Sequence, residues 1–153
     1  MRDGPRGSRR VAALPPPPRP AAESPTPRPV ERTLLIVDDE PLERRLVAHA
    51  LAGRHRVLEA HDPASALDVL ERGEVDLVLL DLHLPPHDAS PREGIRLCGR
   101  IRELQPAAAV VVISANGDAE VRAQLLRMGA RAFLVKPVDA RRLVGVVRDL
   151  LDR

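Results

Sequence analysis

Three short apolar runs, each ended abruptly by a charged residue, constrain the fold of this chain more than any other feature. They are Leu34–Val37 before Asp38 and Asp39, Leu77–Leu80 before Asp81, and Phe133–Val135 before Lys136. Runs of this kind are typical of strands that are buried on both faces of a parallel sheet. Ligands of such sheets bind at the carboxyl ends of the strands. We therefore expect these charged side chains to meet at one edge of a sheet.

The charges expected at this edge do not balance, and the imbalance favours a metal ion. Two carboxylates about 4 Å apart repel by roughly 4 kcal/mol at an effective dielectric constant near 20. One lysine cannot neutralise three carboxylates, whereas a hard divalent cation can. Magnesium favours one or two carboxylates together with waters and a phosphate oxygen. The sequence therefore predicts a site for Mg²⁺ and a phosphoryl group.

Lys136 is the only lysine of the chain, whose 24 basic side chains are otherwise all arginine. A compact ammonium suits a point contact with a phosphate or a carboxylate that a planar guanidinium does not make. The alternative is that this lysine survived by chance in a GC-rich coding sequence. The difference between the two cations favours a specific role at the strand ends.

Residues 1–32 differ in composition from the rest of the chain. They hold nine of its 16 prolines, Pro15–Pro18 among them, and seven arginines. Such a segment buries too little apolar surface to offset its ordering entropy, so we expect a disordered tail. It is either a ligand for a proline-binding groove, a spacer, or the product of a start codon assigned too far upstream. Residues 33–153 carry 17 basic and 19 acidic side chains, which argues against direct nucleic-acid binding.

Two further features concern the compartment. The single cysteine, Cys98, cannot form an internal disulfide and fits a reducing cytosol. No apolar run approaches the roughly 18 residues of a membrane span. We expect a cytoplasmic protein without a membrane partner.

From Thr33 onward the pattern alternates strands with helices. The expected strands are 33–37, 56–59, 76–80, 109–113 and 131–135, and a helix is expected after each. Asp62, Asp118 and Asp139 are expected to cap helices. The first helix carries apolar residues that suggest one buried stripe: Leu42, Leu46, Val47, Ala50 and Leu51. Five strands and five helices in this order predict a doubly wound α/β fold with a parallel sheet.

Residues 33–153 resemble the receiver domain of bacterial two-component response regulators. The resemblance rests on Leu34–Glu40, Leu77–Asp81 with Pro85, Val111–Ala115 and Phe133–Pro137. These segments are weak individually and specific together. The resemblance implies a flavodoxin-like sheet of strand order 2-1-3-4-5. It also implies a stand-alone receiver, which acts through a partner because no output domain follows the last helix.

The resemblance assigns a role to each matched residue at the strand ends. Asp81 is expected to accept a phosphoryl group. Asp39 is expected to bind Mg²⁺ directly, and Asp38 is expected to hold it directly or through water. Asp81 and the backbone carbonyl of His83 complete the expected ligands. Lys136 is expected to pair with the phosphoryl oxygens. Carboxylates are competent nucleophiles for phosphoryl transfer, and metal and lysine supply the charge neutralisation that the transition state needs.

The resemblance further implies a conformational switch. Ser114 would donate its hydroxyl to the phosphoryl group and Phe133 would swing inward behind it. A cis peptide bond is expected before Pro137. The contact face would be the surface of residues 121–148. The expected partners are a sensor histidine kinase or phosphotransfer protein, and a downstream target or a second copy of the chain. No enzymatic activity is expected beyond phosphorylation and dephosphorylation of the chain itself.

The chain departs from the family pattern in the loop after the third expected strand. Gly94, the glycine that opens the third helix, lies 13 residues after Asp81, farther than in most receivers. The segment 86–93 is therefore expected to be lengthened. His83 and Asn116 occupy the flanking positions that tune the phosphoryl lifetime in the family.

Other functions fit the residues less well. A magnesium-dependent phosphohydrolase of the haloacid dehalogenase type needs a second acid two residues after the first, where this chain has His83. A nucleotide- or flavin-binding module needs a glycine-rich first turn, where this chain has Asp38, Asp39 and Glu40. A degenerate receiver that acts as a protein-interaction module is disfavoured because the acids and the lysine are all present.

Overall fold

The computed structural model describes residues 4, 12–18, 31–85 and 90–152. Gly4 and residues 12–18 are exposed and belong to no helix or strand. Most of the expected tail and residues 86–89 of the lengthened loop lie outside the described residues. The disorder of residues 1–32 and the role of the loop therefore stay predictions.

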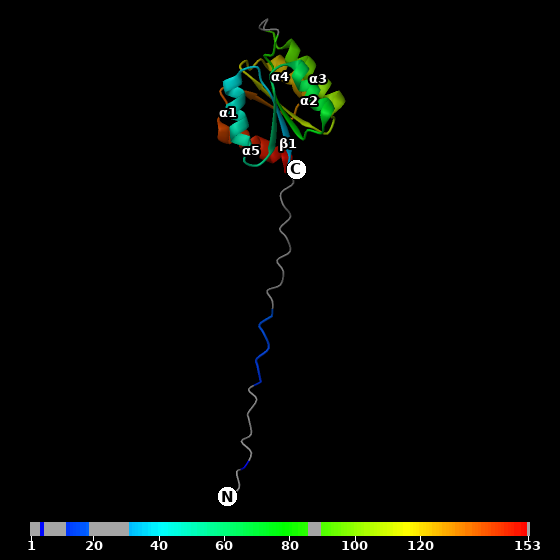
Figure 1. Cartoon of the computed structure of the whole chain (residues 1–153). Coiled ribbons are helices and arrows are strands. Elements are labelled where there is room, and N and C mark those ends of the chain that lie inside the picture. Colours follow the sequence, from blue (N-terminus) through cyan, green and yellow to red (C-terminus); the bar gives the residue numbers. More distant parts are fainter. Residues whose placement is uncertain (1–3, 5–11, 19–30, 86–89, 153) are drawn as a thin grey trace. The chain divides into compact units, whose positions relative to one another are not determined.

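Strands and helices alternate from Thr33 to Leu151 (Figure 1). The strands are β1 (Thr33–Val37), β2 (Arg56–Ala60), β3 (Leu77–Asp81), β4 (Ala109–Ser114) and β5 (Ala132–Val135). The helices are α1 (Pro41–Leu51), α2 (Pro63–Arg72), α3 (Arg92–Leu104), α4 (Ala119–Arg127) and α5 (Ala140–Leu151). The strands pair in parallel in the order β2-β1-β3-β4-β5. This confirms the predicted flavodoxin-like sheet with five helices.

Local chemistry explains where several helices begin. Asp62 accepts the backbone N–H of Ser65 at 2.7 Å, and the Ser65 hydroxyl accepts the N–H of Asp62 at 3.2 Å, which closes a capping box before α2. Asp118 and Asp139 each accept a backbone N–H of the first turn of α4 and α5, both at 2.9 Å. The three predicted caps are confirmed. Proline occupies the first position of α1 and α2, where its missing N–H costs nothing.

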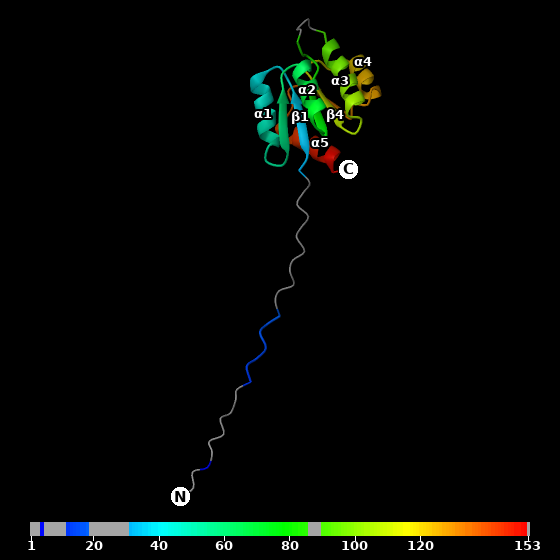
Figure 2. The same cartoon turned by 45° about the vertical axis from the view of Figure 1, so that its right-hand side comes forward.

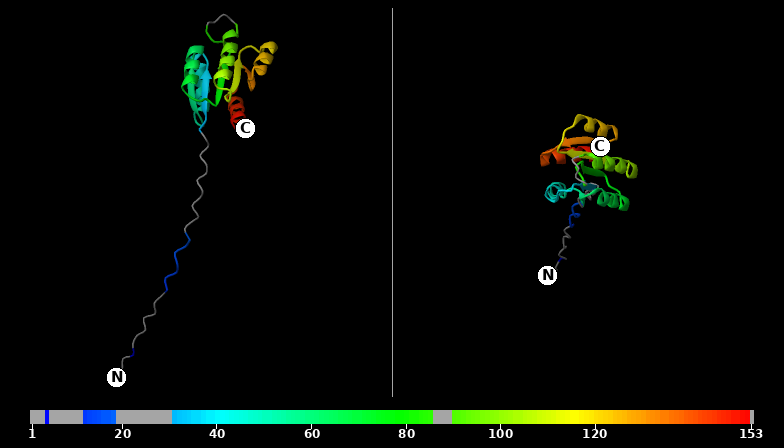
Figure 3. Two further views of the ribbon diagram at one scale, coloured as in Figure 1. Left: turned by 90° about the vertical axis from the view of Figure 1, so that its right-hand side faces the viewer. Right: turned by 90° about the horizontal axis from the view of Figure 1, so that it is seen from above.

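The sheet separates two apolar cores, and the turned views show helices on both of its faces (Figures 2 and 3). Side chains of a strand point alternately to the two faces. Leu35, Val78 and Val112 pack with α2, α3 and α4 in one core. Leu34 and Leu79 pack with α1 and α5 in the other. Both faces of the inner strands are thus covered, which is why these strands are apolar almost throughout.

The predicted stripe on α1 is wrong for Leu42 and Leu46, which are 68% and 63% exposed. Leu51 lies nine residues after Leu42. At 3.6 residues per turn, that spacing places the two side chains on opposite sides of the helix. The buried side of α1 consists of Val47, Ala48 and Leu51, which pack in the core with α5. Leu42 and Leu46 therefore form an exposed apolar pair.

Gly94 fixes the approach of α3 to the end of β3. A Cβ atom at this position would lie 2.5 Å from the Cα atom of Leu82 and 2.6 Å from its carbonyl oxygen. Any other residue would push α3 or the segment after Asp81 out of place. The predicted helix-opening glycine is therefore required by packing. None of the helices in the described ranges has the length and apolar character needed to span a membrane.

Candidate functional site

Strand register brings the acidic residues together. Val37 of β1 lies beside Leu80 of β3 in the parallel ladder. Continuing that register by one residue sets Asp38 beside Asp81, on strands that run about 5 Å apart. Asp38 and Asp81 also fall on the strand face that packs against α1 and α5, as Ile36 and Leu79 do. The sheet thus places two carboxylates side by side at its carboxyl edge.

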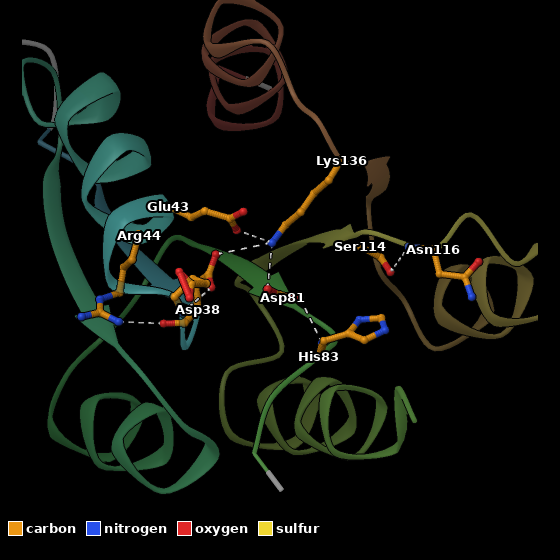
Figure 4. A network of polar contacts seen from close by, with 9 residues as sticks. Asp38, Glu43, Arg44, Asp81, His83, Ser114, Asn116 and Lys136 are labelled. Atoms are coloured by element: carbon orange, nitrogen blue, oxygen red, sulfur yellow. Dashed lines mark hydrogen bonds and ion pairs between the residues drawn. The ribbon is translucent and has the colours of Figure 1, made fainter. Parts of the chain in front are cut away.

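Asp81 is buried, and each of its carboxylate oxygens has a polar contact. Its side chain is 7% exposed. One carboxylate oxygen, Oδ1, accepts the backbone N–H of His83 at 3.0 Å. The other, Oδ2, lies 2.9 Å from the Lys136 ammonium (Figure 4). Both contacts stabilise the ionised carboxylate, which is the form that can act as a nucleophile.

Asp38 lies next to Asp81, in an environment that disfavours its charged form. Its Oδ1 atom accepts the backbone N–H of Glu40 at 2.9 Å, and its Oδ2 atom lies 3.7 Å from the Lys136 ammonium. Burial raises the pKa of Asp38 to about 6, and the charges of Asp81 and Glu43 add to the rise. The Glu40 hydrogen bond and Lys136 lower the pKa only partly. An added cation would relieve this excess of negative charge.

Arg44 of α1 anchors the backbone that carries these acids. Its guanidinium donates to the carbonyl of Asp38 at 2.8 Å and to the Glu59 carboxylate of β2 at 3.1 Å. The Arg44 side chain is 17% exposed, and its contact with the Asp38 carbonyl is partly buried, whereas Glu59 is 42% exposed. Figure 4 shows the Arg44 guanidinium and the Lys136 ammonium on opposite sides of Asp38. The β1–α1 turn is therefore held in place by a residue that the sequence analysis did not single out.

Lys136 directly follows β5, and its ammonium contacts three carboxylates. Its ammonium contacts the Glu43 carboxylate of α1 at 2.6 Å as well as Asp81 and Asp38. Burial alone would lower the pKa of Lys136, but the hydrogen bonds to Glu43 and Asp81 and the charges of Asp81 and Asp38 raise it well above its usual range. Lys136 is therefore fully charged. The predicted cis peptide bond is present between Lys136 and Pro137.

The carboxylates that cluster in the described part of the chain are not the predicted set. Asp38, Glu43 and Asp81 each offer an oxygen within 4.8 Å of the others. Asp39 is half-buried beside them and does not join this group, although it makes interactions of its own. Glu43 was not predicted. Asp38 and Asp81 belong both to this group and to the predicted ligands, and their carboxylate oxygens fit the preference of Mg²⁺.

The other predicted residues lie on the β4 side of Asp81. Ser114 ends β4 and is buried; its hydroxyl accepts the Asn116 N–H at 3.2 Å and makes no other hydrogen bond within the described residues. Its proton is thus available to a bound group. Nδ1 of His83 is buried without a hydrogen-bond partner in the same part of the chain. Phe133 is buried in the core with α2, α3 and α4.

Comparisons with known proteins agree on one family. The family model of the response regulator receiver domain matches residues 34–148. The sensor histidine kinase RcsC of Salmonella typhimurium is 39% identical over 106 residues, which are 69% of this chain and 11% of that protein. The transcriptional regulatory protein GlrR of Escherichia coli K12 is 33% identical over 121 residues, which are 78% of this chain and 26% of that protein.

A solved structure supports the same assignment. The response regulator receiver domain protein (CheY-like) of Methanospirillum hungatei JF-1 matches with a TM-score of 0.73 and 26% identity, covering 80% of this chain and 94% of that one. This chain spans only a small part of the two curated relatives, so their activities as whole proteins do not transfer to it. The segment matched by the family model nevertheless includes β2 to β5, all of β1 except Thr33, and every residue of the acidic edge. The chain belongs to the response regulator receiver domain family.

Proposed function

We propose that this receiver is a phosphorylatable signalling switch in which Asp81 accepts a phosphoryl group from a phosphohistidine. The donor is a sensor histidine kinase or a phosphotransfer protein of a two-component system in the cytoplasm. The observation that carries the proposal is the Asp81 carboxylate, buried at a strand end 2.9 Å from the only lysine of the chain. Receivers are signalling switches rather than classical enzymes, and we assign no other activity.

The chemistry is a transfer between two nucleophiles. An Asp81 carboxylate oxygen forms a bond to phosphorus as the bond between phosphorus and the donor imidazole breaks, and the imidazole leaves with the electron pair. Lys136 stabilises the negative charge on the phosphoryl oxygens. Asp38, Asp39, Asp81 and the His83 carbonyl would hold Mg²⁺. When bound, Mg²⁺ supplies the remaining positive charge that the transferred group needs.

The response to phosphorylation begins at Ser114. A phosphoryl group adds negative charge and acceptor oxygens at Asp81. The Ser114 hydroxyl has no acceptor within the described residues and can donate to one of these oxygens. Ser114 pairs with Val135 in the ladder, and Phe133 lies on the same face two residues earlier. Movement of Ser114 is therefore transmitted to Phe133 and to the surface formed by residues 121–148.

Two exposed apolar regions suit the expected partners. Leu42 and Leu46 lie on the helix that begins directly after the acidic turn, where a phosphohistidine donor must approach. Leu126 of α4 and Val135 of β5 are 42% and 43% exposed on the surface formed by residues 121–148. We assign the first region to the donor. The second region is assigned to a downstream target or a second copy of the chain.

The two other candidate functions make different demands. A phosphohydrolase of the haloacid dehalogenase type would need a second acid two residues after Asp81, where this chain has His83. A degenerate receiver would lack a working acceptor, whereas Asp81 and Lys136 are in contact here. The geometry supports the phosphorylatable receiver best.

Intact-mass measurement after incubation with Mg²⁺ and acetyl phosphate tests the proposal. The wild-type chain should gain one phosphoryl group, and Asp81→Asn should gain none. Ser114→Ala serves as a matched control, because it leaves the acceptor in place and should still be labelled. Absence of labelling in the wild type, or equal labelling of Asp81→Asn, would refute the assignment of Asp81.

A further inference from the structure

Lys136 is engaged by a carboxylate that phosphoryl transfer does not require. Its shortest contact, 2.6 Å, is to Glu43, and the contact to Asp81 is 2.9 Å. Glu43 stands in the first turn of α1, 93 residues before Lys136 in the chain. Figure 4 shows Glu43 reaching the ammonium from the α1 side, with His83 on the opposite side of Asp81. Glu43 thus contacts the lysine without being one of the residues predicted to bind Mg²⁺.

The two carboxylates that accept hydrogen bonds from Lys136 differ in burial, and this difference decides which contact can be broken. The Glu43 side chain is 47% exposed, whereas that of Asp81 is 7% exposed. If Lys136 turns away, water can hydrate Glu43, but Asp81 is left with an unpaired buried charge. Lys136 has a flexible stem and three donors, so it can change partners without moving the backbone. The contact with Glu43 is therefore the one that can be broken and remade.

A phosphoryl group on Asp81 makes two demands on this arrangement. It needs the Lys136 ammonium, which Glu43 holds, and it brings new negative charge close to the Glu43 carboxylate. An oxygen of Glu43 already lies within 4.8 Å of the carboxylate oxygens of Asp81 and Asp38. Competition for Lys136 and repulsion between like charges both disfavour the phosphoryl group.

From these contacts we infer that Glu43 is a positioning residue that holds the Lys136 ammonium while Asp81 is unmodified and competes with the phosphoryl group for it. Glu43 thereby weakens the hold of the site on a phosphoryl group and favours its loss. The inference rests on the proposed function and adds a regulatory residue to it. Removing the Glu43 charge should therefore make the site bind a phosphoryl group more tightly, although the substitution deletes an ion pair.

The single lysine makes a direct experiment possible. The full chain is labelled with ¹³C-lysine, so that one side-chain signal reports on Lys136 alone. Wild type, Glu43→Gln and Glu120→Gln are compared, each titrated with beryllofluoride in the presence of Mg²⁺. Beryllofluoride coordinates a carboxylate oxygen reversibly and stands in for the phosphoryl group. Glu120 is a matched control because it is also an acid in the first turn of a helix, α4, at the same edge of the sheet.

We expect Glu43→Gln to shift the lysine signal before any ligand is added and to bind beryllofluoride about fivefold more tightly than wild type, the size of a partly exposed ion pair. The half-life of the phosphoryl group after acetyl phosphate treatment should lengthen by a similar factor. Glu120→Gln should match wild type in all three measurements. Glu43 is partly exposed, so its replacement should not disturb folding.

Two failures can be told apart. If wild type binds beryllofluoride and Glu43→Gln binds it equally or more weakly, Glu43 does not compete for Lys136 and the inference is wrong, while the proposed function stands. An unshifted lysine signal in Glu43→Gln leads to the same conclusion. If wild type neither binds beryllofluoride nor gains a phosphoryl group, the proposed function fails and the inference fails with it.

Discussion

Replacing Asp38 by asparagine should stabilise the metal-free protein, because burial makes the Asp38 charge costly. Burial, and secondarily the charges of Asp81 and Glu43, raise the pKa of Asp38 from 3.8 to about 6. A rise of this size corresponds to about 3 kcal/mol of free energy of unfolding. Asparagine keeps an acceptor for the Glu40 N–H and removes the charge. We therefore expect Asp38→Asn to raise the free energy of unfolding by about 2–3 kcal/mol near pH 8.

The gain should depend on pH with a definite sign. The folded chain holds the proton of Asp38 more tightly than the unfolded chain, since the folded pKa is the higher one. Wild type therefore loses stability as the pH rises from about 4 to above 6, and Asp38→Asn does not share that loss. Below about pH 4 the carboxyl is neutral in both states, and the gain from the substitution should vanish.

Urea unfolding followed by circular dichroism, in a chelating buffer at about pH 4 and about pH 8, measures this difference. Asp149→Asn is the control, because its side chain is 68% exposed; it should change stability by less than about 0.5 kcal/mol. Added Mg²⁺ should stabilise wild type more than Asp38→Asn, since a ligand stabilises the state that binds it. A destabilised Asp38→Asn at about pH 8, or a gain independent of pH, would show that the cost of burying this charge has been misjudged.

Three further substitutions test how the site is held. Gly94→Ala should lower the free energy of unfolding by about 1–3 kcal/mol, because its methyl group would overlap the backbone after β3; an unchanged stability contradicts this. Gln105→Ala should cost about 2–3 kcal/mol in the same assay without affecting acetyl phosphate labelling, since its amide makes three hydrogen bonds to backbone groups. Arg44→Met should weaken Mg²⁺ binding, measured by calorimetry, about tenfold, because it frees the Asp38 carbonyl. Glu59→Gln keeps the hydrogen bond between Arg44 and the Asp38 carbonyl. An equal loss of Mg²⁺ affinity in Glu59→Gln would therefore contradict this role of Arg44.

The sheet could be predicted because its strands are apolar on both faces and end at charges. The order of strands came from the family resemblance, and the structure confirms it. One boundary shifts for a local reason. Asp76, expected to begin the third strand, instead lies just before β3. There its side chain accepts the Thr33 N–H and its own N–H donates to the Thr33 carbonyl, both at 2.8 Å. The pattern of apolar residues cannot predict that a side chain, and not a backbone carbonyl, accepts the hydrogen bond from the neighbouring strand.

The candidate site was predictable only in part. Asp38 and Lys136 directly follow apolar strands and Asp81 ends one, so a parallel sheet of this strand order brings them to the same edge. Glu43 resembles any acid in the first turn of a helix, where negative charge is favoured in any case. Its contact with Lys136 depends on how α1 lies against the turn after β5, which no local pattern encodes. The exposed face of α1 does not follow from a list of apolar residues, because 3.6 residues per turn place Leu42 opposite Leu51.

In the proposed switch, the division of the site between the two faces of the sheet explains how a change of charge reaches a distant surface. Asp81 and Lys136 share the strand parity of residues that pack against α1 and α5. Ser114 and Phe133 share the parity of the core with α2, α3 and α4. A phosphoryl group on Asp81 extends beyond the edge of the sheet, where both faces meet, and can therefore be contacted by Lys136 from one side and by Ser114 from the other. Glu43 acts on the first of these contacts alone, so it can alter the phosphoryl lifetime without disturbing the path through Ser114 and Phe133.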